Sequence, residues 1–529
     1  MRLLLSPAIL LSVFLVIAGD LAAAQLTLSG GGLLTGPASP EGERLDYKTQ
    51  FSGAWEVVSA DSGVSAMHLA VTRENKAIMF DATIFGASHA RLPANMSCRP
   101  DINRKNESVL DCYAHAVEFD LKTYRTRVLK AILGDGSFVV LGGRRSFNYE
   151  FVPPEAATSS TLFDLRFLRV TTDGRDENNL YPFIHLSTDG NLFVFANNRS
   201  ILLQPRTGRV LREFPVLPGG SRNYPASGMS VLLPLVLRHQ RSVAARQPAP
   251  FPAQVLICGG APHESFHLVD NANTFLPALK SCGRLTITDA NANWVMEDMP
   301  IPRTIGDMLL LPNGDVLLIN GARTGCSGWD FARDPVLAPL LYKPGASRVT
   351  GLGRWKELAP TAIPRMYHST SAVLPDASIL VSGSNTNPRY NFTTLFPTEL
   401  RVEKFRPPYL DPALAAQRPE ILAASVPKEI TYTESFTVEF TGAKAQEADV
   451  KVTMYAPPFT THGFSMNQRL LVLRVEEFRP VGNGNAAAAA VKVLAPPSGD
   501  VAPPGWYMLF VVCKGLPSDA AWIHIQAKL

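Results

Sequence analysis

Short apolar runs alternate with polar turns along this chain from residue 68 to residue 383. In the clearest copy, residues 308–321, one apolar run leads into Asn313-Gly314 and a second ends on Asn320-Gly321. Asn-Gly and Asp-Gly readily adopt the positive φ values that tight hairpin turns need. The pattern therefore predicts a β-hairpin at each copy. The other copies lie at residues 68–80, 131–143, 185–195 and 371–383, with a degenerate copy around 254–260.

The spacing of these hairpins indicates the architecture. The turns fall near residues 74, 135, 189, 254, 313 and 376, which gives steps of 61, 54, 65, 59 and 63 residues. A period of about 50 to 60 residues, with small residues after the second strand, is typical of kelch-type propeller blades. An ordinary β-sandwich does not explain six copies at nearly constant spacing. The sequence predicts an all-β chain whose larger part is a β-propeller with six readable blades.

A second pattern begins after a proline-rich link at residues 405–412. Short alternating strands follow Arg418-Pro419, as expected for an immunoglobulin-like β-sandwich. Residues 483–490 are expected to form a flexible tip, and Trp506-Tyr507 to lie in the core of the last strand. The expected strands are residues 436–440, 450–454, 470–475, 491–494 and 506–512.

The expected domain order begins with a secretory signal. Arg2, a short apolar stretch at residues 9–18 and Ala22-Ala23-Ala24 have the three parts of a cleavable signal peptide. No later apolar segment is long enough for a transmembrane helix. The predicted domains are a signal peptide at 1–24, a propeller at 25–405, a linker at 406–418 and an immunoglobulin-like domain at 419–529.

Other features agree with secretion to the extracellular space or cell wall. Acceptor triplets for N-glycosylation begin at Asn95, Asn106, Asn198 and Asn391. The six cysteines form no CxxC pair, which excludes a zinc finger. Cys98 and Cys112 flank a polar stretch and are the expected disulfide, while the pairing of Cys258, Cys282, Cys326 and Cys513 stays open.

The net charge of the chain bears on whether it binds nucleic acid or an anionic membrane. The net charge is +4 over 529 residues, and no basic cluster occurs. This excludes nucleic acid and an anionic membrane as the main partner. We expect a monomer.

One set of residues suggests metal chemistry. Tyr367 and His368 are adjacent, and His462 lies 94 residues downstream in the second domain. A phenolate oxygen and two imidazole nitrogens suit copper(II) in a tetragonal geometry. Strand alternation would point adjacent residues to opposite faces, so Tyr367 and His368 must lie at a strand end or turn. A metal bound by all three must sit where the two domains meet.

Other polar residues are expected to be structural. His68, His115 and His185 are predicted to be strand histidines whose hydrogen bonds are satisfied. Ser465 and Gln468-Arg469 are expected to form a solvated strand end, with a position close to the metal as the alternative.

The elements together resemble the copper radical oxidases, specifically the secreted, plant-type glyoxal oxidases related to galactose oxidase. The resemblance covers nearly the whole mature chain. It is carried by five segments, residues 144–154, 223–230, 366–369, 397–410 and 460–469.

The resemblance implies a copper centre and a protein radical. Tyr367 would be an axial ligand that accepts the substrate proton, and His368 and His462 would hold copper equatorially. In the family, a tyrosine joined by a thioether to a cysteine is the fourth ligand and stores one oxidising equivalent. The expected reaction oxidises a small aldehyde, such as glyoxal or methylglyoxal, or a primary alcohol. Oxygen would be reduced to hydrogen peroxide.

The chain departs from the family at the radical pair. The family carries the cysteine in a Trp-Cys-Ser type motif and the tyrosine in an Arg-Trp-Tyr type motif, and the propeller sequence has neither. Both belong where Lys130 runs directly into Ala131, and about one blade is missing there, since the family has seven. Cys112, Tyr113 and Tyr149 are near in sequence but match neither motif. The oxidase activity of this chain is therefore in doubt. The alternative is an inactive extracellular propeller that binds cell-wall polysaccharide or a protein.

Overall fold

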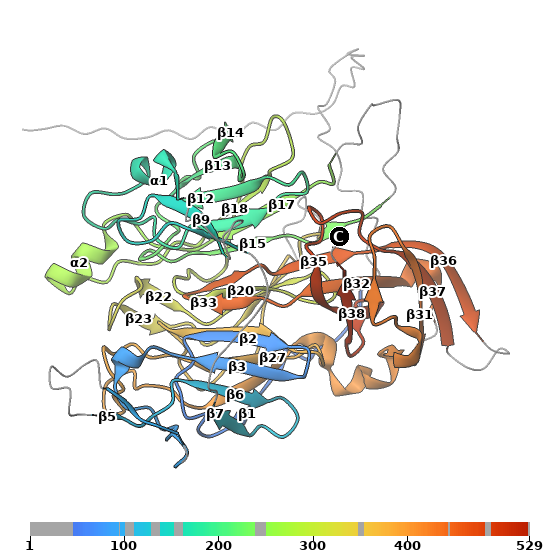
Figure 1. Ribbon diagram of the computed structural model, residues 1–529, viewed down its shortest axis with the longest axis horizontal. Coiled ribbons are helices and arrows are strands. Elements are labelled where there is room, and N and C mark those ends of the chain that lie inside the picture. The colour runs from blue at the N-terminus through green and yellow to red at the C-terminus, as the bar shows by residue number, and fades with distance from the viewer. Residues whose placement is uncertain are drawn as a thin grey trace, which may run out of the picture. The chain divides into compact units, whose positions relative to one another are not determined.

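The computed structural model describes residues 46–94, 96–100, 110–128, 138–152, 162–238, 250–346, 354–442, 445–481 and 488–526. The expected signal peptide, the Lys130–Ala131 junction, the Asp135-Gly136 turn, and the acceptors Asn95 and Asn106 lie outside these ranges. Strands dominate the described chain, which is all-β (Figure 1).

Antiparallel sheets form six blades among the described residues, which confirms the predicted fold class. Five blades have four strands of the propeller and one has three. The blades are β2 (His68–Thr72), β3 (Lys76–Phe80), β6 (Ala116–Asp120) and β7 (Thr126–Val128); β8 (Phe138–Leu141), β9 (Asn148–Val152) and β10 (Phe163–Asp164); β11 (Phe183–Leu186), β12 (Leu192–Ala196), β13 (Arg199–Gln204) and β14 (Arg209–Glu213); β15 (Met229–Leu232), β17 (Gln254–Cys258), β18 (Ser281–Thr286) and β19 (Val295–Asp298); β20 (Asp307–Leu310), β21 (Val316–Ile319), β24 (Leu340–Tyr342) and β25 (Trp355–Glu357); and β26 (Ser369–Val373), β27 (Ile379–Gly383), β28 (Val402–Arg406) and β1 (Ala54–Ser59).

The last of these blades closes the ring. Its strand β1 comes from the start of the described chain and pairs with β28 from the end of the propeller, with Ala54 opposite Arg406. Smaller elements lie between and beside the blades: β4 (Arg99–Pro100), β5 (Leu110–Asp111), β16 (Leu235–Val236), β22 (Ala322–Gly325), β23 (Ala332–Pro335), α1 (Arg166–Val170) and α2 (Ser265–Ala272).

Four of the six predicted turns are confirmed, one is wrong, and the turn near residue 135 lies outside the described residues. Asn75, Gly190, Gly314 and Ala377 all have positive φ, between 56° and 94°, at the tips of their hairpins. The predicted turn near residue 254 is wrong, because Gln254 begins β17 and that strand pairs with β15 across a long connection. The connection leaves the blade to form β16, so no local turn marks this hairpin in the sequence.

The C-terminal region folds as two packed sheets. One contains β16, β35 (Arg469–Val472), β32 (Val450–Ala456), β38 (Gly505–Cys513), β40 (Ala521–Ile525) and β30 (Glu429–Ile430), with β39 (Leu516–Pro517) beside β38; the other contains β29 (Glu420–Ile421), β31 (Ser435–Thr441), β37 (Ala488–Leu494) and β36 (Arg474–Val481). Tyr507 lies in the core, as predicted, whereas Trp506 is only partly buried and packs against Arg73.

Two predictions in this region are wrong. The expected strand at residues 470–475 is split at Leu473, because β35 and β36 belong to different sheets. Residues 488–490 belong to β37 rather than to a flexible tip; the preceding residues 482–487 are outside the described ranges.

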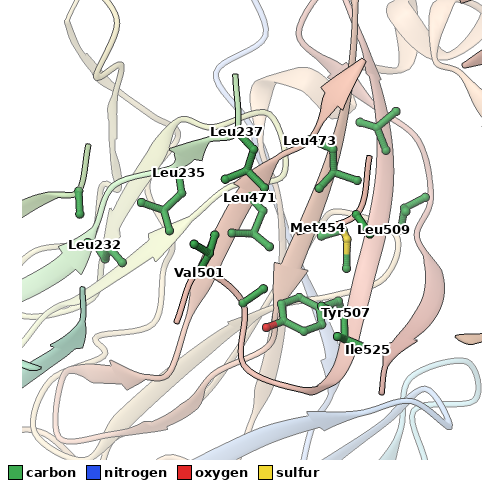
Figure 2. Packing of buried hydrophobic residues seen from close by; sticks show 14 of the residues in the cluster. Leu232, Leu235, Leu237, Met454, Leu471, Leu473, Val501, Tyr507, Leu509 and Ile525 are labelled. Atoms are coloured by element: carbon green, nitrogen blue, oxygen red, sulfur yellow. The ribbon is translucent and has the colours of Figure 1, made fainter. Parts of the chain in front are cut away.

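The two regions share a hydrophobic core. β16 leaves its blade and pairs in parallel with β35, with Leu235 opposite Leu471. Figure 2 shows Leu235 and Leu237 beside Leu471 and Leu473, with Met454, Tyr507 and Leu509 continuing the same cluster.

Two disulfides are present. Cys98 and Cys112 are joined, as predicted, and Cys258 pairs with Cys282 on the neighbouring strand. Cys326 and Cys513 are buried free thiols. Among the described residues we find no helix with the length and apolar character needed to cross a membrane.

Asp307, at the start of β20, is a buried carboxylic acid and gives a prediction about pH. One oxygen accepts hydrogen bonds from Asn320 and Ser371, at 3.0 and 2.8 Å, while Oδ1 has no partner in the described structure. Burial raises the pKa of this carboxyl to about 7. The folded state then holds a proton that the unfolded state releases above about pH 4, so stability falls as pH rises from about 4 to 7.

We expect Asp307→Asn to remove this part of the pH dependence. Urea unfolding of the two proteins at about pH 4.5 and about pH 7.5 tests it, because the wild type should lose more stability between the two values than the variant. Equal losses in both proteins would contradict the assignment of the proton to Asp307.

Candidate copper site

Tyr367 and His368 lie in a turn immediately before β26. His368 has φ of 64°, in the left-handed region, and the amide of Ser369 donates to the carbonyl of Met366 at 3.0 Å. The turn removes the strand alternation that would separate neighbouring side chains. The two rings stack with centroids 3.7 Å apart, and both residues are buried.

A buried ion pair next to this turn holds the turn in place. Arg365 contacts the Glu403 carboxylate through Nη2 at 2.9 Å and Nε at 3.1 Å. The same guanidinium donates to the carbonyls of Gly383 and Arg401, so four hydrogen bonds hold one fully buried side chain. The backbone that presents Tyr367 is therefore fixed by Arg365.

His462 lies at the tip of a short hairpin that we did not predict. Strands β33 (Phe459–Thr461) and β34 (Phe464–Met466) are joined by the two-residue loop His462-Gly463, with φ of 51° and 76°. Positive φ at both positions is the signature of a type I′ turn. His462 Nδ1 is bonded to Thr461 Oγ1 at 2.7 Å, which leaves Nε2 for a metal.

Strand pairing brings this hairpin to the propeller. β33 adds to the edge of β2, with Thr461 opposite His68, and Figure 1 shows it beside β2. Gly463 lies so close to the carbonyl oxygen of Gly306 that a Cβ atom there would be only 2.7 Å from it. The structure thus brings all three predicted residues together: ring centroids are 5.0 Å apart for His368 and His462 and 6.0 Å apart for Tyr367 and His462.

The polar residues after the hairpin are not solvated, contrary to the sequence-based expectation. Ser465, Gln468 and Arg469 are all buried. The Gln468 amide binds the backbone of β20 at both Leu310 N and Met308 O, while Arg469 donates to Val501 O at 2.8 Å and to Leu186 O. These side chains attach the C-terminal strands to the blades, and so help to place His462.

The three strand histidines behave differently from one another. His185 is bonded to Ser230 at 2.7 Å, as expected for a structural histidine. His115 lies just before β6; its Nδ1 is bonded to Asp81 at 2.7 Å, but its buried Nε2 has no hydrogen-bond partner in the described structure and lies 3.5 Å from Asp111. His68 stacks on Phe80, and its ring centroid lies 6.2 Å from that of His462. Its buried Nδ1 has no hydrogen-bond partner in the described structure, so the prediction of a satisfied side chain is wrong for His68.

Two tyrosines at the site were missed. The Tyr224 hydroxyl lies 3.0 Å from the Tyr367 hydroxyl, and the Tyr181 ring stacks on His462 with centroids 4.6 Å apart. Tyr224 belongs to the segment 223–230 that carries part of the family resemblance, and that membership was the only sequence signal for it.

The electrostatics of the cluster fit a metal. Burial, and then neighbouring histidines, hold the pKa of His368 well below its ordinary value, and burial lowers that of His462 to about 3. Both rings are therefore neutral and able to donate lone pairs. Buried Nδ1 of His368 has no partner among the described residues. Burial, and then Tyr224, raises the pKa of Tyr367, so a bound cation must displace its proton. An N,N,O donor set of this kind suits copper(II).

Cys112 and Tyr149, which lie near the missing motifs in sequence, do not fit the thioether cofactor. Cys112 is already joined to Cys98, so its sulfur is not free to bond to a tyrosine ring. The Tyr149 ring is buried against Phe163, and its hydroxyl donates to Pro205 O. Neither Cys112 nor Tyr149 can replace the missing motifs.

Comparison with known proteins identifies the family. The profile of the glyoxal oxidase N-terminus matches residues 67–132 and 129–409, and that of the galactose oxidase-like Early set domain matches residues 418–525. The chain belongs to the glyoxal oxidase family. The family match is interrupted where its two pieces meet, at residues 129–132, and this is the Lys130–Ala131 junction.

Similar proteins of the glyoxal oxidase family come from plants. The aldehyde oxidase GLOX1 of Arabidopsis thaliana is 44% identical over 89% of this chain and 84% of its own length. The putative aldehyde oxidase Art an 7 of Artemisia annua is 41% identical over 91% and 90% of the two chains. A fungal alcohol oxidase of the AA5 family, solved in complex with copper, covers 90% of this chain with a TM-score of 0.53 at 16% identity, which shows a shared fold.

The alignment with the Arabidopsis relative contains positions that have no counterpart in this chain. It extends over 535 positions, yet 89% of 529 residues is only about 471, so about 64 positions face no residue of this chain. This total is the length of one propeller blade in this chain, whose repeats are 54 to 65 residues apart.

Proposed function

We propose that this protein is an extracellular, copper-binding oxidase of small aldehydes, with Tyr367, His368 and His462 as copper ligands. The observation that carries the proposal is the convergence of these three buried side chains from two parts of the sequence. The names of the plant relatives, which are aldehyde oxidases, support the substrate class. The two disulfides agree with an oxidising, extracellular location.

Each residue has a defined task in this proposal. His368 and His462 donate neutral nitrogens and fix the position of the metal. Tyr367, protonated until a cation binds, holds or accepts a proton at its hydroxyl oxygen next to the substrate position. Tyr181 covers one face of His462 and limits access of water to that ligand. Copper, when bound, supplies a reversible one-electron couple and polarises a substrate oxygen.

The number of electrons that the reaction releases determines whether the protein can turn over without the missing blade. Conversion of a hydrated aldehyde to a carboxylic acid releases two electrons and two protons, which reduce oxygen to hydrogen peroxide. Copper alone accepts one electron, and the propeller sequence lacks the two motifs that carry the thioether cofactor, which accepts the other electron in the family. We therefore assign turnover to a form of the protein that contains the extra blade. The relatives give no support to a purely polysaccharide-binding or protein-binding propeller.

The experiment compares the 529-residue chain with a longer chain that contains the missing segment. Sequencing the transcript across Lys130 and Ala131 shows whether the cell makes the longer form. Both proteins are then purified, loaded with copper, and assayed for peroxide with glyoxal and methylglyoxal. We expect both to bind one copper ion and only the longer protein to turn over rapidly. Failure of both to bind copper would overturn the site, and rapid turnover by the printed chain would overturn the electron argument.

A further inference from the structure

Tyr224 is a residue of this cluster to which the proposed function gives no role. Its hydroxyl oxygen lies 3.0 Å from that of Tyr367, and either atom can be the donor of the bond. Its ring is edge-on to His462, with centroids 6.1 Å apart. The side chain thus faces two of the three candidate ligands at once.

The segment that carries Tyr224 is held rigidly. The Tyr224 backbone forms a bridge with Leu180, and the amide of Ser327 donates to the carbonyl of Pro225 at 2.8 Å. On the other side, the amide of Ile305 donates to Ser227 O at 2.7 Å. The fully buried Arg222 donates to the backbone carbonyls of Pro218, Gly259 and Ser281, which surround the segment. The hydroxyl of Tyr224 is therefore directed at Tyr367 by the surrounding backbone, a degree of support typical of a functional group.

The separation of the two hydroxyls is the one that adjacent metal ligands require. Metal bonds of about 2 Å to nitrogen or oxygen place two donors at right angles about 2.8 Å apart. One proton now joins the two oxygens in a hydrogen bond. A cation that replaced this proton, and displaced the second one, would find the two oxygens close to the separation that two such ligands need.

Charge favours the same arrangement. With two neutral histidines and one phenolate, a buried copper(II) centre keeps a net positive charge, and an unbalanced buried charge is costly. A second phenolate makes the centre neutral.

We propose that Tyr224 supplies the fourth protein donor to copper in this chain, as a phenolate beside that of Tyr367. It occupies the role that the tyrosine of the missing blade would otherwise have. The inference rests on the proposed copper site. It concerns metal binding alone, and assigns no redox step to Tyr224.

The test is copper(II) titration of the purified printed chain and of Tyr224→Phe, which keeps the ring and removes the oxygen. Isothermal titration gives the affinity, and the visible phenolate-to-copper charge-transfer band with electron paramagnetic resonance reports the ligand set. We expect Tyr224→Phe to bind copper more than about 100 times more weakly, beyond the cost of losing an outer-shell partner, with a weaker charge-transfer band and an altered resonance spectrum. Tyr432→Phe is the matched control, since it also loses one hydroxyl, here bonded to Ala502 O at 2.8 Å in the C-terminal strands.

The possible results distinguish failure of the proposed copper site from failure of the ligand role of Tyr224. If wild type and Tyr432→Phe bind no copper, the proposed site fails and the inference fails with it. If wild type binds copper and Tyr224→Phe matches it in affinity and spectra, the site stands and Tyr224 is no ligand. Weaker binding with unchanged spectra would also overturn the ligand role, because Tyr224 would then act only by positioning Tyr367.

Discussion

Replacing His462 by asparagine will remove copper binding and leave the fold intact. Asparagine followed by Gly463 is the preferred sequence for a type I′ turn, and asparagine tolerates the φ of 51° found here. The substitution therefore keeps the hairpin and deletes only the imidazole. We expect copper affinity to fall by more than about 100-fold, beyond the cost of losing an outer-shell partner.

The measurement is copper titration together with thermal unfolding of the metal-free proteins. The midpoint of the His462→Asn variant should equal or exceed that of the wild type. His89→Asn serves as the control, because His89 is a surface histidine paired with Asp61, and it should bind copper as the wild type does. Unchanged affinity in His462→Asn would remove this residue from the site.

Removing the guanidinium of Arg365 will have the largest effect on stability. In Arg365→Leu the Glu403 carboxylate stays buried with the hydroxyl of Thr361 as its remaining partner, and the carbonyls of Gly383 and Arg401 lose a donor. Breaking one side of a buried ion pair costs about 3 to 5 kcal/mol. The turn that presents Tyr367 and His368 rests on this pair, so copper affinity should fall as well.

Urea unfolding of three variants checks this assignment. Arg365→Leu with Glu403→Leu should recover much of the loss, because no buried charge is then left unpaired. Arg127→Leu breaks a surface pair with Glu118 in which the arginine side chain is 73% exposed, and it should cost less than about 1 kcal/mol. If Arg365→Leu were as stable as Arg127→Leu, the buried pair would not anchor the turn.

Local sequence was sufficient for most of the blades. Asp189-Gly190 and Asn313-Gly314 determine their turns through backbone preferences that act within two residues, so those hairpins were predictable. The hairpin at residue 254 was not, because its two strands are separated by a long connection that pairs with the other domain.

The candidate site was predictable in part for a related reason. Tyr367, His368 and His462 were found from residue type and family resemblance, but their meeting depends on β33 pairing with β2, which no local pattern encodes. Gln468 and Arg469 were misinterpreted because a polar side chain that bonds to a distant backbone looks, in sequence, like one that bonds to water. His68 was misinterpreted as a satisfied strand histidine, and Tyr181 and Tyr224 were missed, because each becomes part of the cluster only through contacts between distant segments.

The attachment of the His462 hairpin to β2 also sets when copper can enter during synthesis. Two of the candidate ligands are made long before the third, and His462 reaches them only after β33 has emerged and joined the edge of an early blade. A chain that stops before residue 462 would have Tyr367 and His368 but an incomplete centre. In the proposed site, copper therefore binds last. A protein that has bound the metal must already have been synthesised and folded from its first blade to its C-terminal sheets.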